Sequence, residues 1–74
     1  MKQIEIRDEF IRLGQAMKLA GLVNEGSEAK EAILAGSVLV NGETETRRGR
    51  KLREGDVFSF EGNEVQICTQ NPSN

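Results

Sequence analysis

Histidine, tyrosine and tryptophan are missing from this chain of 74 residues, which has one cysteine and one proline. Because no imidazole is present to activate the thiol of Cys68, the sequence gives little support to nucleophilic or acid–base catalysis. The acidic residues show no EF-hand or paired-carboxylate spacing, and a lone cysteine cannot form a zinc site. We therefore expect a protein that is not an enzyme and that binds no metal and no cofactor.

Long hydrophobic runs are also missing. No segment approaches the roughly 20 apolar residues that cross a bilayer, and the N-terminal residues do not resemble a secretory signal. The single Cys68 excludes an internal disulfide, which suits a reducing compartment, and we expect its thiol to be buried and inert. A length of 74 residues with 36% hydrophobic content leaves room for one small domain. We expect a cytoplasmic monomer without a membrane partner.

Aromatic residues are scarce, at 4% of the chain. Proteins that read single-stranded nucleic acids stack bases on exposed aromatic rings. Phe58 and Phe60 alternate within a predicted strand, and Phe10 precedes a helical stripe, so we expect all three in the core. Base stacking is therefore not expected, and phosphate and shape recognition of a folded or double-helical target is favoured.

Positive charge, by contrast, is concentrated in one place, which we call the basic segment. It holds 5 of the 10 basic residues within the run Arg47-Arg48-Gly49-Arg50-Lys51-Leu52-Arg53. The segment carries +5 and the rest of the chain −7, although the net charge is only −2. Such segregation favours a polyanion that binds locally to this segment. Two other interpretations remain open, a solvated loop that opposes aggregation and a nuclear localisation signal.

The first third of the chain predicts a strand followed by a helix. Apolar and charged residues alternate over residues 2–6, as in a half-buried strand. An apolar stripe with helical spacing follows at Leu13, Ala16, Met17 and Ala20, and Gly21 can end that helix in a left-handed conformation.

A second short helix is predicted to begin at Ser27, which would be its N-cap, and to end at Gly36. Residues 38–40 are rich in strand formers and run into Asn41-Gly42, a strong hairpin signal with a returning strand over residues 43–46. Further strands are expected over residues 57–60 and 65–67. The fold class is therefore α+β: one domain over residues 1–68, with two short helices packed on short, mostly antiparallel strands. The basic segment falls in a loop, and residues 69–74 form a disordered polar tail.

The order and spacing of these motifs resemble the RNA-binding domain named after ribosomal protein S4, the alpha-L motif. The resemblance runs from about Phe10 to Ile67. It rests on Arg12-Leu13, Leu19-Ala20-Gly21-Leu22-Val23, Ser27-Glu28-Ala29-Lys30, Ile33, Gly36, Val38-Leu39-Val40-Asn41-Gly42 and Arg50-Lys51-Leu52-Arg53-Glu54-Gly55-Asp56. The basic segment is similar to that of small stand-alone bacterial members of the family.

The resemblance implies that two helices and the adjoining loop engage structured RNA, ribosomal or transfer RNA, or a ribosomal subunit. The RNA-contacting residues would be Arg12, Lys18, Ser27, Lys30, Arg47, Arg48, Arg50, Lys51 and Arg53. The chain departs from the usual pattern at Gly14, where many members have an acidic residue, and at Gly26, where many have a basic one. Glu28 and Glu31 also reduce the positive charge of the second helix, so the basic segment should contribute more of the RNA binding.

We therefore expect a non-enzymatic protein that recognises structured RNA, ribosomal RNA first, through phosphates and shape, in ribosome assembly or rescue. The alternative is a protein-interaction module whose basic segment binds an acidic partner.

Overall fold

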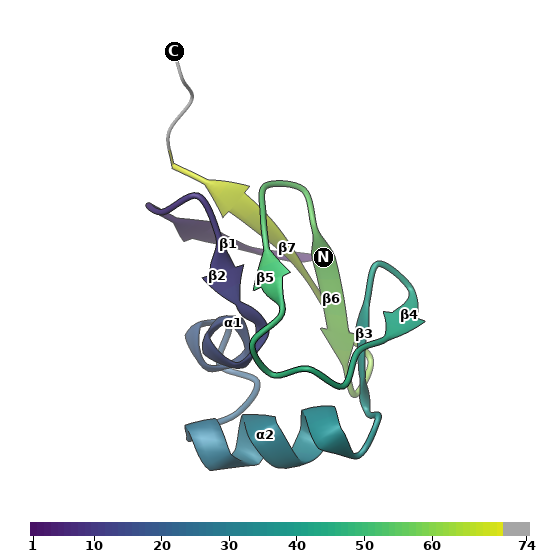
Figure 1. Ribbon diagram of the computed structural model, residues 1–74. Coiled ribbons are helices and arrows are strands. Elements are labelled where there is room, and N and C mark those ends of the chain that lie inside the picture. The colour runs from purple at the N-terminus through teal and green to yellow at the C-terminus, as the bar shows by residue number, and fades with distance from the viewer. Residues whose placement is uncertain (71–74) are drawn as a thin grey trace.

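The structure, a computed structural model, describes residues 1–70 (Figure 1). Its elements in chain order are β1 (Lys2–Ile6), β2 (Ile11–Arg12), α1 (Leu13–Leu19), α2 (Gly26–Leu34), β3 (Val38–Val40), β4 (Glu43–Thr44), β5 (Lys51–Leu52), β6 (Val57–Phe60) and β7 (Asn63–Thr69). The α+β class and the two short helices are thereby confirmed.

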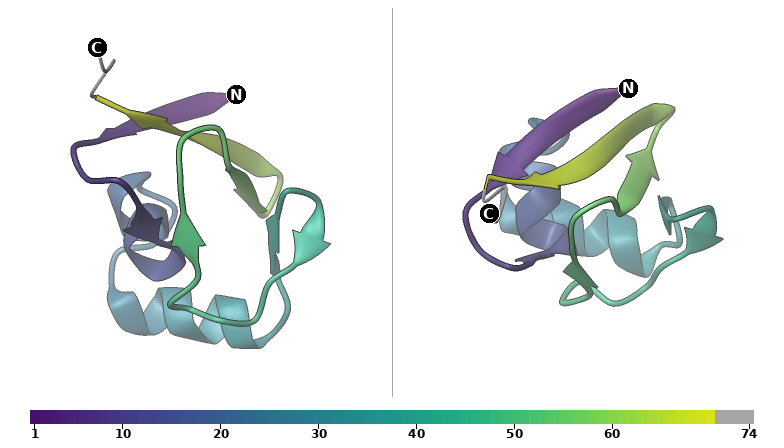
Figure 2. Two further views of the ribbon diagram at one scale, coloured as in Figure 1. Left: turned by 45° about the horizontal axis from the view of Figure 1, so that its top comes forward. Right: turned by 90° about the horizontal axis from the view of Figure 1, so that it is seen from above.

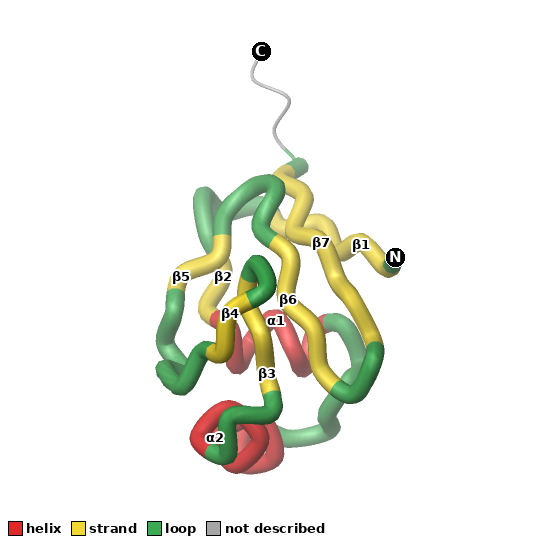
Figure 3. The backbone as a smooth tube through the Cα atoms, turned by 90° about the vertical axis from the view of Figure 1, so that its right-hand side faces the viewer, coloured by secondary structure: helices red, strands yellow, loops and turns green. Residues whose placement is uncertain are grey.

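The strands form one sheet in the order β1-β7-β6-β3-β4 and a separate pair, β2-β5. All pairings are antiparallel except that of β1 with β7, which is parallel. Figures 2 and 3 show α1 behind the sheet and α2 at one end of it. The helices therefore leave the opposite face of the sheet open to solvent.

Both helices end as their sequences predict, at a glycine in the left-handed region. Gly21 has φ of 78° and Gly36 has φ of 81°. After α1, the N–H of Gly21 donates to the carbonyl of Lys18 and that of Leu22 to the carbonyl of Met17, both at 3.0 Å. These are the two bonds of a Schellman motif, which satisfies carbonyls that the helix itself leaves free.

The beginning of α2 differs from the prediction, because Ser27 lies inside the helix and Glu25 is the N-cap. The Oε1 atom of Glu28 accepts hydrogen bonds from the backbone N–H groups of Asn24, at 2.6 Å, and Glu25, at 3.2 Å. A glutamate three residues after the N-cap satisfies free donors in this way. Ser27 is thus exposed and not a cap.

The core is the apolar stripe of α1 packed against α2 and the inner face of the sheet. Leu13, Ala16 and Met17 are fully buried, as are Ala29 and Ile33 of α2. Because isolated helices this short are marginal in water, this packing is what holds them. Phe58 also lies in the core and Phe60 packs against it, as predicted.

The Asn41-Gly42 hairpin is confirmed, with φ of 52° and 87° at its two turn residues. The Asn41 side chain does more than favour the turn, because its Oδ1 accepts a hydrogen bond from the N–H of Val57 at 3.0 Å. This bond ties the hairpin to the start of β6.

Two further expectations for the C-terminal part need correction. Thr69, expected in the polar tail, is the last residue of β7, and the N–H of Gln70 donates to the carbonyl of Ile6 at 2.8 Å. The remainder of the expected tail, residues 71–74, lies outside the described residues. Cys68 is half-buried rather than buried, in β7 beside Glu5 of β1. Within residues 1–70, no helix has the length and apolar character that would span a membrane.

Candidate nucleic-acid interface

The basic segment is not the free loop that its sequence suggests. Lys51 and Leu52 form β5, which pairs with Ile11 and Arg12 of β2, and Leu52 is fully buried. In Figure 1 the chain between β4 and β5, which includes residues 47–50 of the segment, runs above α2 in that view. A two-residue ladder is too short to show a strand pattern, which is why the sequence did not reveal it. The pairing fixes one end of the segment against the start of α1.

Helix α1 uses the basic segment as its N-terminal cap. The N–H of Leu13 donates to the carbonyl of Arg50 at 2.8 Å, and that of Gly14 to the carbonyl of Arg48 at 3.1 Å. Arg12, the N-cap residue, makes no side-chain cap bond. Since the first N–H groups of a helix lack partners inside it, these carbonyls take the place of a capping side chain. The segment and α1 are thereby joined backbone to backbone.

Gly14 allows this close approach. A Cβ atom at position 14 would lie 2.8 Å from Cγ and 3.2 Å from Cδ of Arg48. Contacts below 3 Å essentially do not occur for a Cβ atom, so any larger residue would displace Arg48. The sequence showed Gly14 only as a departure from the family pattern, and the structure supplies its reason.

Glu45 organises the other side of the basic segment. Its side chain is 7% exposed, and its Oε2 lies 2.9 Å from Nε of Arg47 and its Oε1 2.8 Å from Nη1 of Arg50. Oε2 also accepts the backbone N–H of Arg47 at 3.0 Å. The hydrogen bonds from Arg47 and then from Arg50 lower the pKa of Glu45 from 4.5 to about 2, against the opposing effect of desolvation. Two of the five basic side chains are thus paired with one carboxylate, which offsets one of the five positive charges.

A cationic hollow of about 370 Å³ opens where α1, α2 and the basic segment meet. Its lining consists of Arg12, Gly14, Gln15, Lys18, Gly26, Arg48 and Gly49. Nη1 of Arg12 donates to the carbonyl of Gly49 at 2.9 Å, which holds the guanidinium against the turn of the segment. Three positive side chains from two separate parts of the sequence therefore surround one hollow that carries no acidic side chain in its lining.

Phe10 contradicts the prediction that it belongs to the core. It is half-buried, and three cations lie over its ring: Nζ of Lys51 at 4.7 Å from the centroid, and Cζ of both Arg12 and Arg53 at 5.6 Å. The negative face of an aromatic ring attracts cations at such distances. Phe10 therefore gathers positive side chains that would otherwise repel one another.

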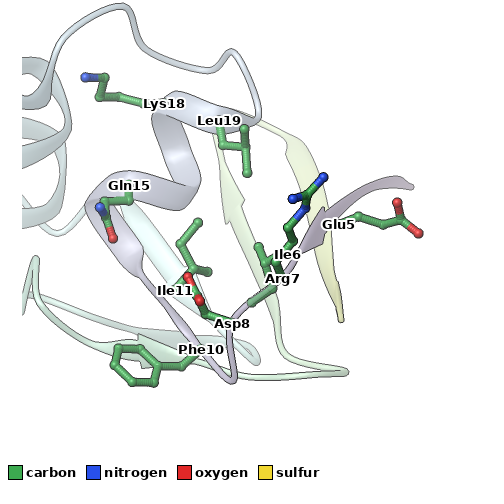
Figure 4. A pocket seen from close by; sticks show the side chains of 9 residues that line it. All are labelled: Glu5, Ile6, Arg7, Asp8, Phe10, Ile11, Gln15, Lys18 and Leu19. Atoms are coloured by element: carbon green, nitrogen blue, oxygen red, sulfur yellow. The ribbon is translucent and has the colours of Figure 1, made fainter. Parts of the chain in front are cut away.

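A second depression, which we call the Phe10 hollow, lies between the β1–β2 connection and α1 (Figure 4). Its volume is about 590 Å³, and its lining consists of Glu5, Ile6, Arg7, Asp8, Phe10, Ile11, Gln15, Lys18 and Leu19. Gln15 and Lys18 line both hollows, so the two adjoin across one face of α1.

The nine residues expected to contact RNA fall into four groups. Arg12, Lys18 and Arg48 surround the cationic hollow. Arg47 and Arg50 bind Glu45, while Lys51 and Arg53, together with Arg12, surround Phe10.

The fourth group, Ser27 and Lys30, is exposed on α2 and lines neither hollow. Lys30 follows Gly26 by four residues, so it lies one turn further along the side of α2 that reaches the cationic hollow. Most of the predicted contacts on the basic segment and α1 thus gather around the cationic hollow and Phe10, whereas those on α2 lie outside both hollows. Among residues 1–70, no three His, Cys, Asp or Glu side chains gather in a group that would hold a metal ion.

Comparison with known proteins identifies the family. The family model of the S4 domain matches residues 4–68. This chain belongs to the S4 domain family. The S4 domain described here is 49% identical over 59 residues to the probable ribosome maturation protein RlbA of Bacillus subtilis (strain 168), covering 80% of this chain and 83% of RlbA. It is 40% identical over 57 residues to the putative RNA-binding protein YbcJ of Escherichia coli (strain K12), covering 77% and 81% of the two chains.

The solution structure of Escherichia coli YbcJ, described as revealing an ALFAL motif involved in RNA binding, superposes with a TM-score of 0.72. The sequences of the two superposed chains are 35% identical, and the match covers 92% of this S4 domain and 87% of YbcJ. The fold expected from the resemblance is therefore confirmed.

Sequence reasoning missed two residues that shape this surface, Glu45 and Phe10. Glu45 stands in a polar run in which nothing distinguishes it from Glu43, which is exposed. Phe10 follows three charged residues, which is the one sign in the sequence that it lies near the surface. The apolar helical stripe that begins three residues later favoured a core position instead.

Proposed function

We propose that this S4 domain is a non-catalytic RNA-binding protein that holds structured RNA, ribosomal RNA first, during ribosome maturation. The observation that carries the proposal is the cationic hollow, in which Arg12, Lys18 and Arg48 converge without an acidic side chain in the lining. Guanidinium and ammonium groups placed together in this way suit phosphate oxygens, and Arg offers them paired donors. The names of the relatives, a probable ribosome maturation protein and a putative RNA-binding protein, support the same conclusion.

The remainder of the surface supports a local binding mode. The chain has a net charge of −2, so phosphates are attracted to the basic segment and repelled elsewhere. Glu28, which the sequence suggested would weaken binding on α2, has its carboxylate engaged with the N–H groups before the helix. The cationic hollow therefore makes the main contact with RNA, and α2 contributes less to the binding.

Reversing the charge of Arg48 tests this function directly. We expect Arg48→Glu to lower affinity for deproteinised ribosomal RNA by about tenfold to a hundredfold in a filter-binding assay, because an ionic hydrogen-bonded contact is lost. Lys2→Glu is the matched control: it changes net charge by the same amount at an exposed residue that lines neither hollow, and should bind as the unaltered protein does. Arg47 and Arg50 are unsuitable for this test, because glutamates there would face Glu45.

Equal binding by folded Arg48→Glu and by Lys2→Glu would overturn the proposal. A pull-down from cells with and without nuclease separates it from an acidic protein partner. If partners remain after RNA is digested and purified ribosomal RNA is not retained, the protein-interaction alternative is correct.

A further inference from the structure

Phe10 is the aromatic residue of this chain that the core does not use. Phe58 is fully buried and Phe60 packs against the core, whereas Phe10 belongs to neither group. Arg12, Lys51 and Arg53 lie over its ring instead of aliphatic side chains. None of these three residues lines the Phe10 hollow although Phe10 does, so the part of the ring that borders the hollow is available to another planar group. A ring placed in this way is a candidate for stacking.

The Phe10 hollow beside this ring is lined in part by apolar side chains, and no side chain of residues 1–70 occupies it. Figure 4 shows Ile11 and Leu19 pointing toward one another across it. Leu19 is 56% exposed, so its side chain is available to contact a ligand in this hollow. Apolar walls with a few convergent polar groups are the ordinary form of a site for a planar organic ligand. The polar groups here include the Gln15 amide and the Asp8 carboxylate.

The charges of the Phe10 hollow distinguish a base from a phosphate. Glu5 and Asp8 in its lining are offset by Arg7 and Lys18, so this hollow carries no net positive charge that would favour a phosphate over a neutral base. The carboxylate of Asp8 can accept a hydrogen bond from an exocyclic amino group, and the Gln15 amide can both donate and accept. The cationic hollow, by contrast, carries Arg12, Lys18 and Arg48 and no acid in its lining.

The two hollows adjoin one another, because Gln15 and Lys18 line both. These residues are three positions apart on α1 and therefore lie on one face of the helix. An RNA strand with a phosphate in the cationic hollow thus has its next base within reach of the Phe10 hollow, on the other side of Gln15.

We propose that the Phe10 hollow binds one unpaired nucleobase of the RNA, stacked on Phe10 and enclosed by Ile11 and Leu19. This inference rests on the proposed function and deepens it. The bound RNA would be a helix interrupted by a bulged or looped base, and a base with an exocyclic amino group would fit better than uracil because of Asp8.

The test compares two RNA hairpins of the same stem sequence, one fully paired and one with a single bulged adenine. We expect the protein to bind the bulged hairpin between about fivefold and a hundredfold more tightly, the effect of stacking one base on an aromatic ring. Phe10→Leu, which keeps the residue apolar but removes the ring, should lose that preference. Its affinity for the paired hairpin should change far less.

Phe10→Trp allows stacking to be followed directly by fluorescence, since the natural sequence contains no tryptophan. Its fluorescence should be quenched by the bulged hairpin and not by the paired one, and the preference should be retained. Phe60→Leu is the matched control, because Phe60 is a half-buried aromatic outside both hollows and its loss should leave the preference intact.

The inference is wrong if the protein shows no preference for the bulged hairpin, or if folded Phe10→Leu keeps it. If binding of both hairpins then still depends on Arg48, the proposed function stands and only the nucleobase site falls. If neither hairpin binds and Arg48→Glu leaves retention of ribosomal RNA unchanged, both proposals fall.

Discussion

At the scale of single residues, the carboxylate of Glu45 determines how the basic segment is held. It lies between Arg47 and Arg50 and makes four hydrogen bonds to them. Among residues 1–70, no buried side-chain nitrogen or oxygen lacks a hydrogen-bond partner, so burial of this charge is compensated. The same contacts raise the pKa of Arg47, as expected for a partnered cation. Glu45 therefore stabilises the segment and engages two of its arginines, although the side chain of Arg47 stays exposed to solvent.

We predict that Glu45 makes the stability of the domain fall in acid. Its pKa is about 2 in the folded state against 4.5 as the reference for the unfolded chain, so its contribution is complete above about pH 5 and is lost as pH falls toward 2. The full shift corresponds to roughly 3 kcal/mol, and we expect about 1 to 2 kcal/mol because solvent screens the exposed Arg47. Glu45→Gln should reduce the free energy of unfolding by that amount at neutral pH and by almost nothing near pH 2.

Urea unfolding followed by circular dichroism, repeated across this pH range, measures the difference. Glu43→Gln, which removes an exposed carboxylate from β4 of the same hairpin, is the matched control and should leave the pH profile nearly unchanged. A Glu45→Gln protein with the same acid sensitivity as the unaltered one would contradict the assignment.

At the scale of elements, the start of α1 and the basic segment behave as one unit. Strand β5 pairs with β2, and the carbonyls of Arg48 and Arg50 cap the helix. The position of the cationic hollow therefore depends on backbone contacts and not only on flexible side chains. A surface held in this way is organised before its ligand arrives, which lowers the entropic cost of binding.

Replacing Gly14 should disturb this unit without unfolding the domain. In Gly14→Ala the new Cβ would meet Cγ of Arg48, so we expect the segment to shift and RNA affinity to fall severalfold. Alanine favours a helix over glycine by up to about 1 kcal/mol, and the contact should offset that gain. Gly26→Ala is the control for stability, since a Cβ there has no neighbour within 4 Å, and it should raise the free energy of unfolding.

Urea unfolding of both variants and filter binding of Gly14→Ala give the result. Equal stabilisation by the two alanines, with unchanged RNA affinity at position 14, would show that the contact with Arg48 is unimportant.

Sequence patterns predicted the elements whose signals are local and missed those that depend on distant partners. The stripe of α1, the glycine ends of both helices and the Asn41-Gly42 turn each follow from a few neighbouring residues. The β2–β5 pair joins two dipeptides that are individually too short to show a period, so only the folded chain reveals it. One local signal was also misread, because Ser27 was chosen as the cap although Glu25 and Glu28, three positions apart, form the capping box.

The same division applies to the candidate site. The sequence located the positive charge correctly but could not tell which side chains are free and which are engaged inside the protein. Glu45 and Phe10 decide that question, and both act on residues of the basic segment through packing that no local pattern records.

At the scale of the whole molecule, the arrangement of charge predicts how binding depends on salt. Of the basic side chains predicted to contact RNA, six remain once Glu45 has engaged Arg47 and Arg50: Arg12, Lys18, Lys30, Arg48, Lys51 and Arg53. Three to five phosphate contacts make the logarithm of affinity fall with the logarithm of salt concentration with a slope of about −2 to −4.

Lys18→Ala should reduce this slope by about one unit, because one phosphate contact is removed. Lys2→Ala, at an exposed residue that lines neither hollow, should leave the slope unchanged. Fluorescence anisotropy of labelled RNA across a salt series measures both. A slope near zero for the unaltered protein would exclude phosphate recognition.

The parallel pairing of β1 with β7 has a consequence for how the chain folds. Gln3 and Gln66, whose side chains bond across the two strands, are 63 positions apart. Contacts between such distant segments slow folding, because nearly the whole chain must be brought together before they form. During synthesis, residues 2–6 emerge from the ribosome long before residues 63–69. Strand β1, which carries the buried side chains of Ile4 and Ile6, therefore has no partner strand until β7 has been translated. The domain is therefore completed in a late step, and a ribosome paused before β7 would carry an S4 domain whose sheet is still open.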